Sequence, residues 1–231
     1  MKIIKQLTVN NEPYGLISDD VRLDLYSPGR ATFEVLSNQT LTGVVSYNAG
    51  WSEASTLRYF IGYIESSITV NPRQQKLFCR ELTATLNRPL HLALRRVTAR
   101  DVLIKITDLT ELNFHMPLSD YMDNQFPYFY HLGDGYHAMD AIGQVYSIPR
   151  YLWQQQGDGS VYVGSWFDSR WSENPVTIPD SLFTQHMSTN SASIAMMPSV
   201  RPGAQFNRGI IDSVQLISET MVISWKPSED W

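Results

Sequence analysis

The sequence predicts a mainly β protein with a small α/β module, of the α+β class. Three observations predict it. Apolar and polar residues alternate with a period of two, punctuated by turn residues, over much of the chain up to residue 86. The apolar spacing changes to that of a helix after residue 98. Strand-like alternation then returns from residue 209 onward.

Composition supports a folded chain and excludes several functional classes. The 231 residues are 43% hydrophobic and 18% charged, which is typical of globular rather than disordered proteins. A net charge of −5 argues against a surface that holds nucleic-acid phosphates. The single cysteine, Cys79, excludes an internal disulfide framework and a thiolate metal cluster within one chain. We find no signal-peptide pattern and no membrane span, and therefore expect a soluble product.

The first β segment begins with a predicted hairpin. Val21, Leu23 and Leu25 alternate with polar residues, Ser27-Pro28-Gly29-Arg30 is expected to form the turn, and residues 31–35 resume the alternation. Further strands are predicted over residues 41–47, 57–64, 67–70 and 76–86. Short strands at this spacing predict a sandwich or a barrel.

A helix is predicted from about residue 99 to residue 112. Thr98 and Asp101 have the spacing of a capping box, in which each side chain accepts a hydrogen bond from a free amide at the helix start. The apolar residues that follow recur at helical spacing, and Ile106 and Leu109 are expected to face the core. A short strand over residues 112–116 should then end at Pro117.

The remaining elements follow from glycine, aspartate and proline positions. A second helix should begin near Asp134-Gly135 and end before Pro149, because proline cannot continue a helix. Strands over residues 151–155 and 160–164 flank Gly157-Asp158-Gly159 and predict a hairpin. The segment 167–199 is expected to be an extended connection with room for one strand. Residues 209–216 and 220–225 predict a last hairpin.

Four residues have the chemistry of a metal site. His131 and His137 lie near Asp134 and Asp140, and all four would be close together if a helix starts at Asp134. The His-Glu-x-x-His spacing of helical zinc sites is absent. We therefore favour a helix cap at Asp134 with a surface histidine over a metal site.

Two carboxylates and one thiol offer further alternatives. Asp134 and Asp158 each lie between two glycines, and paired carboxylates can hydrolyse glycosidic bonds. Turn formation explains the same positions, since aspartate and glycine suit the dihedral angles of tight turns. Cys79 lies in a predicted strand, where a small buried residue is the simpler interpretation than a reactive thiol.

Aromatic residues gather in two stretches of the chain. Core packing explains most of them, while exposed aromatics could stack on sugars or anchor a subunit interface. The two groups are Tyr121, Phe126, Tyr128, Phe129, Tyr130 and Tyr136, and then Tyr151, Trp153, Tyr162, Trp166, Phe167 and Trp171.

Three groups of predicted strand and helix segments follow one another along the chain, and their order is the basis for a comparison with known families. The first is Phe60-Ile61-Gly62-Tyr63-Ile64 with Leu77-Phe78-Cys79-Arg80-Glu81-Leu82, which leads into the helix after Thr98. The second is Pro127-Tyr128-Phe129-Tyr130 before the second helix, with residues 157–164 after it. The third is Arg201-Pro202-Gly203 with residues 209–214 and 221–225.

In this order the segments resemble the baseplate and tail-tip hub proteins of tailed phages, the late-control protein family that is related to the hub part of type VI secretion spikes. The resemblance implies two tail-tube-like β-barrel or sandwich modules joined by a small α/β module. It divides the chain into a first barrel over residues 1–97, the α/β module over 98–166, and strands of a second barrel over 167–231. Little chain remains for this second barrel, which is therefore expected to be minimal or completed by a neighbour.

The resemblance also implies a function. The chain would be the structural hub of a tail tip or baseplate, a homotrimer whose ring continues the tail tube and connects it to the tip or spike. Its partners would be the tail-tube protein, tip, spike or other baseplate proteins, and the tape-measure protein. DNA would pass through an acidic or neutral lumen without specific binding. The protein would be part of the virion, assembled in the host cytoplasm.

No catalytic residue, cofactor site or metal site is expected in this interpretation. Two alternatives remain open. A receptor-binding or glycan-binding tail module would need its aromatic clusters exposed in a groove. A cell-wall hydrolase would need a catalytic constellation of side chains, which the sequence does not show.

Overall fold

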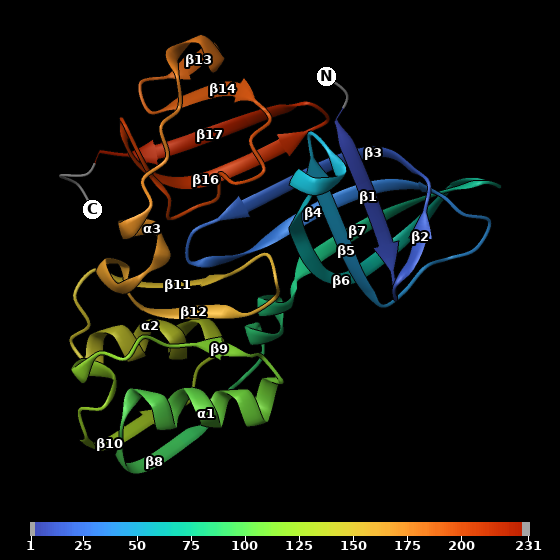
Figure 1. Ribbon diagram of the computed structural model, residues 1–231. Coiled ribbons are helices and arrows are strands. Elements are labelled where there is room, and N and C mark those ends of the chain that lie inside the picture. The colour runs from blue at the N-terminus through green and yellow to red at the C-terminus, as the bar shows by residue number, and fades with distance from the viewer. Residues whose placement is uncertain (1–2, 228–231) are drawn as a thin grey trace. The chain divides into compact units, whose positions relative to one another are not determined.

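The computed structural model describes residues 3–227, which divide into two compact units (Figure 1). Unit 1 combines Met1–Glu81 with Asn174–Trp231, and unit 2 is Leu82–Glu173. The predicted class, mainly β with a small α/β module, is confirmed. The module boundaries expected at residues 97 and 166 both lie within the residue range of unit 2. The strand that ends at residue 97 pairs with another strand of that unit.

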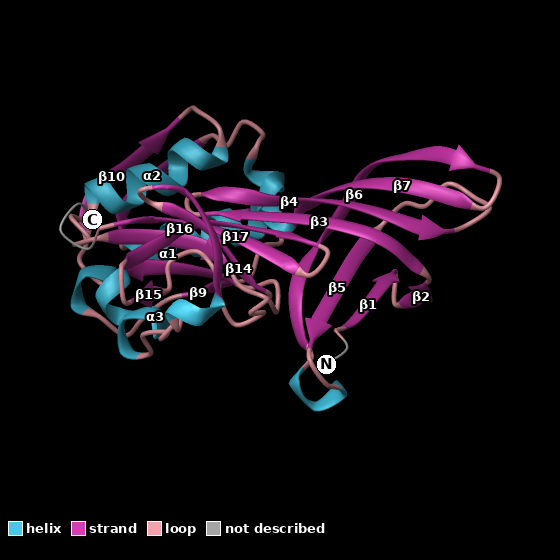
Figure 2. Ribbon diagram, turned by 90° about the horizontal axis from the view of Figure 1, so that it is seen from above, coloured by secondary structure: helices cyan, strands magenta, loops and turns pink. Residues whose placement is uncertain are grey.

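Unit 1 is built on one 12-stranded sheet. Eleven strands follow the order β13-β14-β17-β16-β3-β4-β7-β6-β5-β1-β2, and β15 pairs with β16 beside this path. Figure 2 shows these strands fanning apart as the sheet curls. Their bounds are β1 (Ile4–Val9), β2 (Glu12–Tyr14), β3 (Leu16–Asp24), β4 (Ser27–Leu36), β5 (Val44–Gly50), β6 (Leu57–Asn71), β7 (Gln74–Glu81), β13 (Phe183–Ser188), β14 (Ser191–Ala195), β15 (Gln205–Phe206), β16 (Gly209–Ile217) and β17 (Thr220–Lys226).

The strands of the two ends of the chain are joined by the pairing of β16 with β3. Val214 lies opposite Leu23 and Leu216 lies opposite Val21, and all four side chains are buried. The join therefore carries the apolar inner face of one segment directly into that of the other. As a result, the two β segments that the sequence suggested as separate modules share one sheet.

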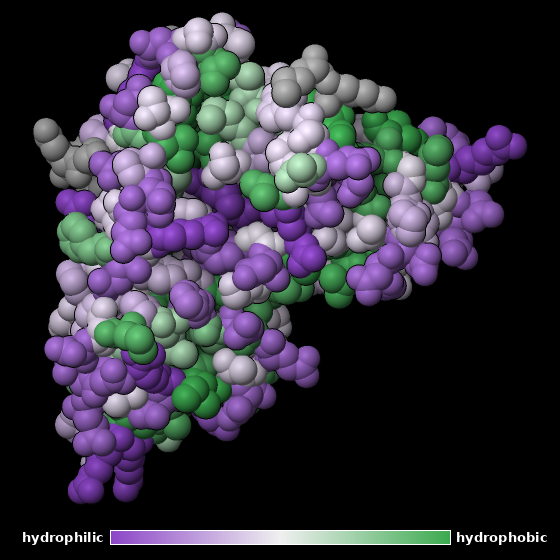
Figure 3. All heavy atoms as spheres, in the orientation of Figure 1, coloured by the Kyte–Doolittle hydropathy of each residue, from purple (hydrophilic) through white to green (hydrophobic). Residues whose placement is uncertain are grey.

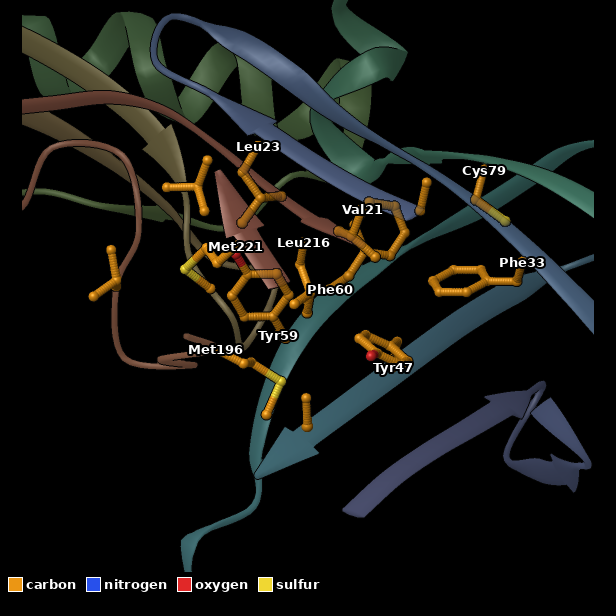
Figure 4. Packing of buried hydrophobic residues seen from close by; sticks show 14 of the residues in the cluster. Val21, Leu23, Phe33, Tyr47, Tyr59, Phe60, Cys79, Met196, Leu216 and Met221 are labelled. Atoms are coloured by element: carbon orange, nitrogen blue, oxygen red, sulfur yellow. The ribbon is translucent and has the colours of Figure 1, made fainter. Parts of the chain in front are cut away.

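A single apolar cluster fills the inner face of this sheet (Figure 4). Phe33 from β4 packs against Tyr47 from β5, with ring centroids 5.1 Å apart, and against Phe60 from β6 at 6.1 Å. Met196 and Met221 extend the cluster into the C-terminal segment. The alternation of buried and exposed residues along each strand is what places these side chains on one face.

Several details of the first β segment differ from the sequence prediction. The strand predicted over residues 76–86 ends at Glu81, and Leu82–Leu86 form the 3-10 helix η2. The turn between β3 and β4 is formed by Leu25 and Tyr26, the latter with φ of 61°, and Ser27 already belongs to β4. Gly29 is buried in that strand, where an added Cβ would meet the Glu81 carboxyl group and Leu23. Residues 57–64 and 67–70 form one strand, β6, with a register shift after Ile64 instead of a break.

The connection over residues 167–199 contains more structure than the single strand expected. It includes the 3-10 helix η5 (Asp180–Leu182) and the strands β13 and β14, which form a hairpin at the edge of the sheet. Ala192 and Ile194 of β14 are buried in the main core. The short segments and many serines conceal this pattern in the sequence.

Unit 2 contains the helices α1 and α2, the one-turn helix α3 and two small sheets. One sheet pairs β8 with β10, and the other has the order β11-β12-β9 with β9 parallel to β12. Figure 1 shows α1 beside β8 and β10, and α2 beside β11 and β12. The elements are η2 (Leu82–Leu86), β8 (Leu92–Val97), α1 (Ala99–Thr110), β9 (Phe114–His115), η3 (Asp120–Met122), β10 (Phe126–His131), α2 (Gly135–Val145), β11 (Tyr151–Gln155), β12 (Val161–Ser165), η4 (Trp166–Asp168) and α3 (Arg170–Glu173).

Helix α1 starts as the sequence predicted. The Thr98 side chain accepts a hydrogen bond from the Asp101 amide, and the Asp101 carboxylate accepts one from the Thr98 amide. Ile106 is fully buried, as expected. The expectation for Leu109 was wrong, because this side chain lies at the border of the buried stripe and is 40% exposed. Thr110 occupies the buried position instead and donates to the Ile106 carbonyl oxygen at 2.7 Å.

Candidate functional site

Asp134 is the N-cap of α2. Its Oδ1 accepts hydrogen bonds from the His137 amide at 3.0 Å and from the His137 ring Nδ1 at 2.9 Å. The hydrogen bond from the His137 amide holds the pKa of Asp134 below its usual value. The His131 ring faces the Asp134 carbonyl oxygen, and Asp140 accepts from the Trp153 indole at 3.2 Å. Among the side chains that the structure describes, which leave out that of His186, no three metal-ligating groups converge.

Asp158 shapes the turn between β11 and β12. Its carboxylate accepts from the Ser160 amide at 2.9 Å and from the Ser160 hydroxyl at 2.7 Å, while Gly159 adopts a positive φ of 94°. Asp134 and Asp158 are thus each engaged with a residue two or three positions away. Neither carboxylate faces the other in a shared cleft that the structure describes.

Replacing either aspartate by asparagine should leave the protein nearly unchanged. Asparagine is as good an N-cap as aspartate and suits the same turns, so we expect Asp134→Asn and Asp158→Asn to lose no more than about 0.5 kcal/mol. Thermal melting measures this, with Asp134→Ala as the comparison that should lose about 1 kcal/mol. A cell-wall-degrading activity that disappears in either asparagine variant would contradict the turn assignment.

Most of the aromatic residues belong to the core of unit 2. Phe129, Trp153, Tyr162, Trp166 and Trp171 are all less than a tenth exposed. The exposed members of the two groups are Tyr128 and Tyr130 on β10 and Phe167 in η4. Core packing therefore accounts for the larger part of both groups, as the sequence indicated.

One pocket in unit 2 touches the second aromatic group. It has a volume of about 260 Å³ and is lined by His115, Tyr162, Asp168, Arg170 and Trp171 among others. The Arg170 guanidinium covers the Trp171 ring at 3.8 Å, and the His115 ring lies 6.2 Å from that of Tyr162. A sugar needs a free ring face for stacking, and the Trp171 face is already occupied by a cation.

Cys79 is a structural residue. It is 3% exposed on the inner face of β7, and burial raises the pKa of its thiol to about 12. The thiol is therefore protonated at neutral pH and has little nucleophilic character. The interpretation as a small buried residue is confirmed.

A buried ion pair joins distant segments of unit 1. Glu81 at the end of β7 and Arg201 in the loop before β15 are 3% and 5% exposed, and their Oε1 and Nη2 atoms lie 3.5 Å apart. The Gly29 amide donates to the other Glu81 oxygen at 2.7 Å, and Arg201 donates to the Tyr59 carbonyl oxygen at 2.6 Å. Burial raises the pKa of Glu81 to about 7, while Arg201 opposes this rise.

Sequence reasoning did not identify this pair, although one signal was present. Leu77, Cys79 and Glu81 alternate along β7, so the period of two places the glutamate on the same inward face as the apolar residues. An inward carboxylate requires a buried partner. No comparable local signal marks Arg201, whose position follows from the path of the loop.

The two edges of the large sheet carry features that oppose strand pairing with other chains. The edge strand β2 has three residues, and its central residue Pro13 lacks an amide donor. The opposite edge strand β13 pairs irregularly with β14, with register shifts on both sides of Gln185 and His186. Short strands, proline and bulges are the usual protection of sheet edges.

The comparisons with known proteins relate the chain to phages. No protein-family model matches it. The chain is 32% identical over 224 residues to an uncharacterized 58.7 kDa protein in the lys 3' region of Haemophilus phage HP1. The matched residues make up 97% of this chain. The match covers 42% of that relative, so the chain spans less than half of its length.

Solved structures share the fold at low sequence identity. A 43 kDa tail protein of prophage MuSo2 from Shewanella oneidensis has a TM-score of 0.70 at 7% identity, and 99% of each chain is covered. A tail protein from Neisseria meningitidis MC58 has a TM-score of 0.67 at 9% identity, with 100% and 99% covered. The chain has the fold of phage tail proteins. The resemblance inferred from the sequence is confirmed at this level.

The same fold occurs in a secretion system. An Escherichia coli component of the type VI secretion system, described as structurally similar to the T4 phage tail proteins gp27 and gp5, has a TM-score of 0.60 at 10% identity. The similarity covers 96% of this chain and 76% of that one. No helix in the described part of this chain is long and apolar enough to cross a membrane.

Proposed function

We propose that the chain is a structural subunit of a phage tail, the hub of a tail tip or baseplate, and that it acts without catalysis. The observation that carries this proposal is the fold similarity over 99% of both chains to a phage tail protein. The Haemophilus phage relative supports a place in the virion. The local roles of Asp134 and Asp158 in a helix cap and a turn give no support to a cell-wall hydrolase.

In the proposed assembly three copies form a ring that continues the tail tube and connects it to a tip or spike. The partners are the tail-tube protein, the tip or other baseplate proteins, and the tape-measure protein. The two β segments of unit 1 would act as tube-like modules within the ring. Since β2 and β13 both carry features that oppose backbone pairing, we place the contacts between copies on side-chain surfaces.

The ring has an acidic or neutral lumen in this proposal. The net charge of −5 supports it, because DNA in a strongly basic channel would be held by its phosphates. Sedimentation with and without the tail-tube protein, followed by averaged images of assembled tails, tests the arrangement. We expect three copies around the channel. A single copy on the tail exterior, or a channel wall rich in Lys and Arg, would contradict it.

A receptor-binding or glycan-binding module is the second candidate. The observation that favours it is the exposure of Tyr128 and Tyr130, 64% and 69%, at alternate positions of β10. Arg95 on the paired strand lies 5.8 Å from the Tyr128 ring centre. Binding of host-surface glycans that Tyr130→Ala abolishes would favour this candidate over the hub.

A further inference from the structure

The sheet of β8 and β10 in unit 2 has two strands and therefore two free edges (Figure 1). Its inner face is covered, because Leu92 and Phe129 are buried in the apolar cluster of the unit. Its outer face carries the rings of Tyr128 and Tyr130, which are 64% and 69% exposed. A free strand edge presents unpaired backbone groups to other chains. The strand β10 therefore offers an edge to which a further strand can pair.

The register of the two strands fixes the direction of the backbone groups of β10. The Leu90 amide donates to the Gly133 carbonyl oxygen at 2.9 Å, in the same register that joins β8 to β10. In an antiparallel ladder only every second pair exchanges hydrogen bonds. Gly133 belongs to the bonded set, and Tyr130 and Tyr128 belong to the alternate set. The amide and carbonyl groups of both tyrosines therefore point away from β8, towards the free edge.

This free edge lacks the protection that marks the outer strands of the large sheet. The pairing of β10 with β8 has no register shift, and β10 contains neither lysine nor a carboxylate. Pro127 is in the strand, but it belongs to the set that faces β8, so its missing amide is not on the free edge. Leu132 directly after the strand is 58% exposed and continues the apolar surface of Tyr128 and Tyr130. The edge is therefore open to pairing.

The outer face beside this edge carries positive charge without a counter-ion. Arg95 of β8 lies opposite Tyr128, and its guanidinium group is 5.8 Å from the centre of that ring. Arg96 follows it in the chain and is also exposed. Neither arginine forms an ion pair with any residue that the structure describes. Neither β8 nor β10 contains an acidic residue.

The carboxylates that lie nearest to these strands along the chain are engaged with other groups. Asp101 accepts from Thr98 in the capping box, and Asp123 Oδ1 lies 2.7 Å from Arg100 Nε. Asp134, after β10, caps α2. The sheet thus keeps two guanidinium groups that these carboxylates do not neutralise. A segment that carries a carboxylate complements this surface.

We propose that an extended segment of a partner polypeptide pairs with the free edge of β10 as a third strand and presents a carboxylate to Arg95. Its amide and carbonyl groups alternate as those of Tyr128 and Tyr130 do, and its side chains cover the two exposed rings. A sugar or a nucleic-acid backbone has no such alternation of amide donors and carbonyl acceptors. A second copy that paired through the same edge would bring two positively charged faces together. The proposal goes beyond the hub function and does not depend on ring formation.

The first test is amide NMR of the full chain with a capped peptide, Glu-Thr-Val-Thr-Val-Thr-Glu, whose valines and glutamates share one face of a strand. We expect the largest shifts at the amides of Tyr128 and Tyr130. The control peptide has proline in place of both valines, which keeps the charge but prevents strand pairing. Absence of shifts at these two amides, or equal shifts with the proline peptide, would overturn the proposal.

The second test compares variants of the two free edges. Tyr130→Pro removes an amide that points away from β8, and Ala93→Pro, opposite Tyr130, is the matched change at the free edge of β8. We expect Tyr130→Pro to weaken peptide binding about fivefold more than Tyr130→Ala, the value of one hydrogen bond. Arg95→Gln should weaken it about threefold and Ala93→Pro should leave it unchanged. Loss of binding in Ala93→Pro with full binding in Tyr130→Pro would place the partner on β8 and overturn the proposal. Should Tyr130→Pro fail to fold, the proline peptide and Arg95→Gln decide the question.

The third test separates a polypeptide from other occupants. A trisaccharide of N-acetylglucosamine and a ten-base oligothymidylate should each shift the Tyr128 and Tyr130 amides less than the peptide does. An equal or larger shift with the trisaccharide would assign the surface to glycans, and one with the oligonucleotide would assign it to nucleic acid. Self-association that Tyr130→Pro abolishes would make a second copy the occupant. Each of these three results would overturn the proposal.

Discussion

Arg201→Met should destabilise unit 1 by about 3–5 kcal/mol at pH 9. The substitution keeps an apolar stem of similar length but leaves the Glu81 carboxylate buried without its counter-ion. A buried charge without a partner is far costlier than the loss of an exposed ion pair. Arg208→Met is the control, because Arg208 pairs with Asp180, whose side chain is 83% exposed, and it should lose about 1 kcal/mol or less. Chemical denaturation of both variants gives the two values.

The effect of Arg201→Met should depend on pH in a defined direction. Burial raises the pKa of Glu81 to about 7, above the value of the unfolded chain, so the folded wild type retains a proton that the unfolded chain releases. This contribution to stability, about 3 kcal/mol, is fully present below pH 4.5 and is lost as the pH rises towards 7. Arg201 holds the Glu81 pKa down, so the variant should keep losing stability above pH 7, where the wild type levels off.

Glu81→Gln provides the second control for the ion pair. The amide cannot ionise, so the double variant Glu81→Gln with Arg201→Met should recover part of the lost stability and should lose the pH dependence between pH 5 and 9. A single Arg201 variant whose stability matches the wild type at pH 9 would show that the contact in the structure carries no energy. A pH dependence that persists in Glu81→Gln would assign it to another group.

Ile106→Asp should prevent unit 2 from folding. Ile106 is fully buried on α1 and packs in the apolar cluster of unit 2, so the aspartate would be a buried charge without a partner and should cost several kcal/mol. Leu109→Asp is the matched control three residues further along the same helix, where the side chain is 40% exposed. We expect this control to remain folded and to lose little stability.

Amide hydrogen exchange resolves where Ile106→Asp acts. Residues 82–173 should lose protection in Ile106→Asp and keep it in Leu109→Asp, since these residues form one compact unit with its own apolar cluster. If Ile106→Asp is soluble and melts like the wild type, the assignment of the buried face of α1 is wrong.

Hydrophobic and hydrophilic residues are mixed on the face of unit 1 that Figure 3 shows. Figure 3 shows hydrophilic residues at the end of the long β6–β7 hairpin and smaller hydrophobic areas elsewhere on the same face. Exposed apolar residues on β6, Ile68 and Val70, are close to polar neighbours along the strand.

Local features of the sequence determined most elements of the fold. The capping box at Thr98 and Asp101, the cap at Asp134 and the glycine turn around Asp158 were all predicted, because each depends on residues within four positions of one another. The same holds for the alternation along β7. The exposure of Leu109 was missed because helical spacing alone does not show where the border of the buried stripe lies.

Only the tertiary structure decided which segments meet. A period of two assigns each strand residue to a face but does not name the neighbouring strand, so the pairing of β3 with β16 and the single sheet of unit 1 could not be predicted. The Glu81–Arg201 pair has the same origin, since the path of a loop brings together two residues that are far apart in the chain. What selects these contacts is the burial of one shared apolar face, which is a property of the whole sheet and of no single segment.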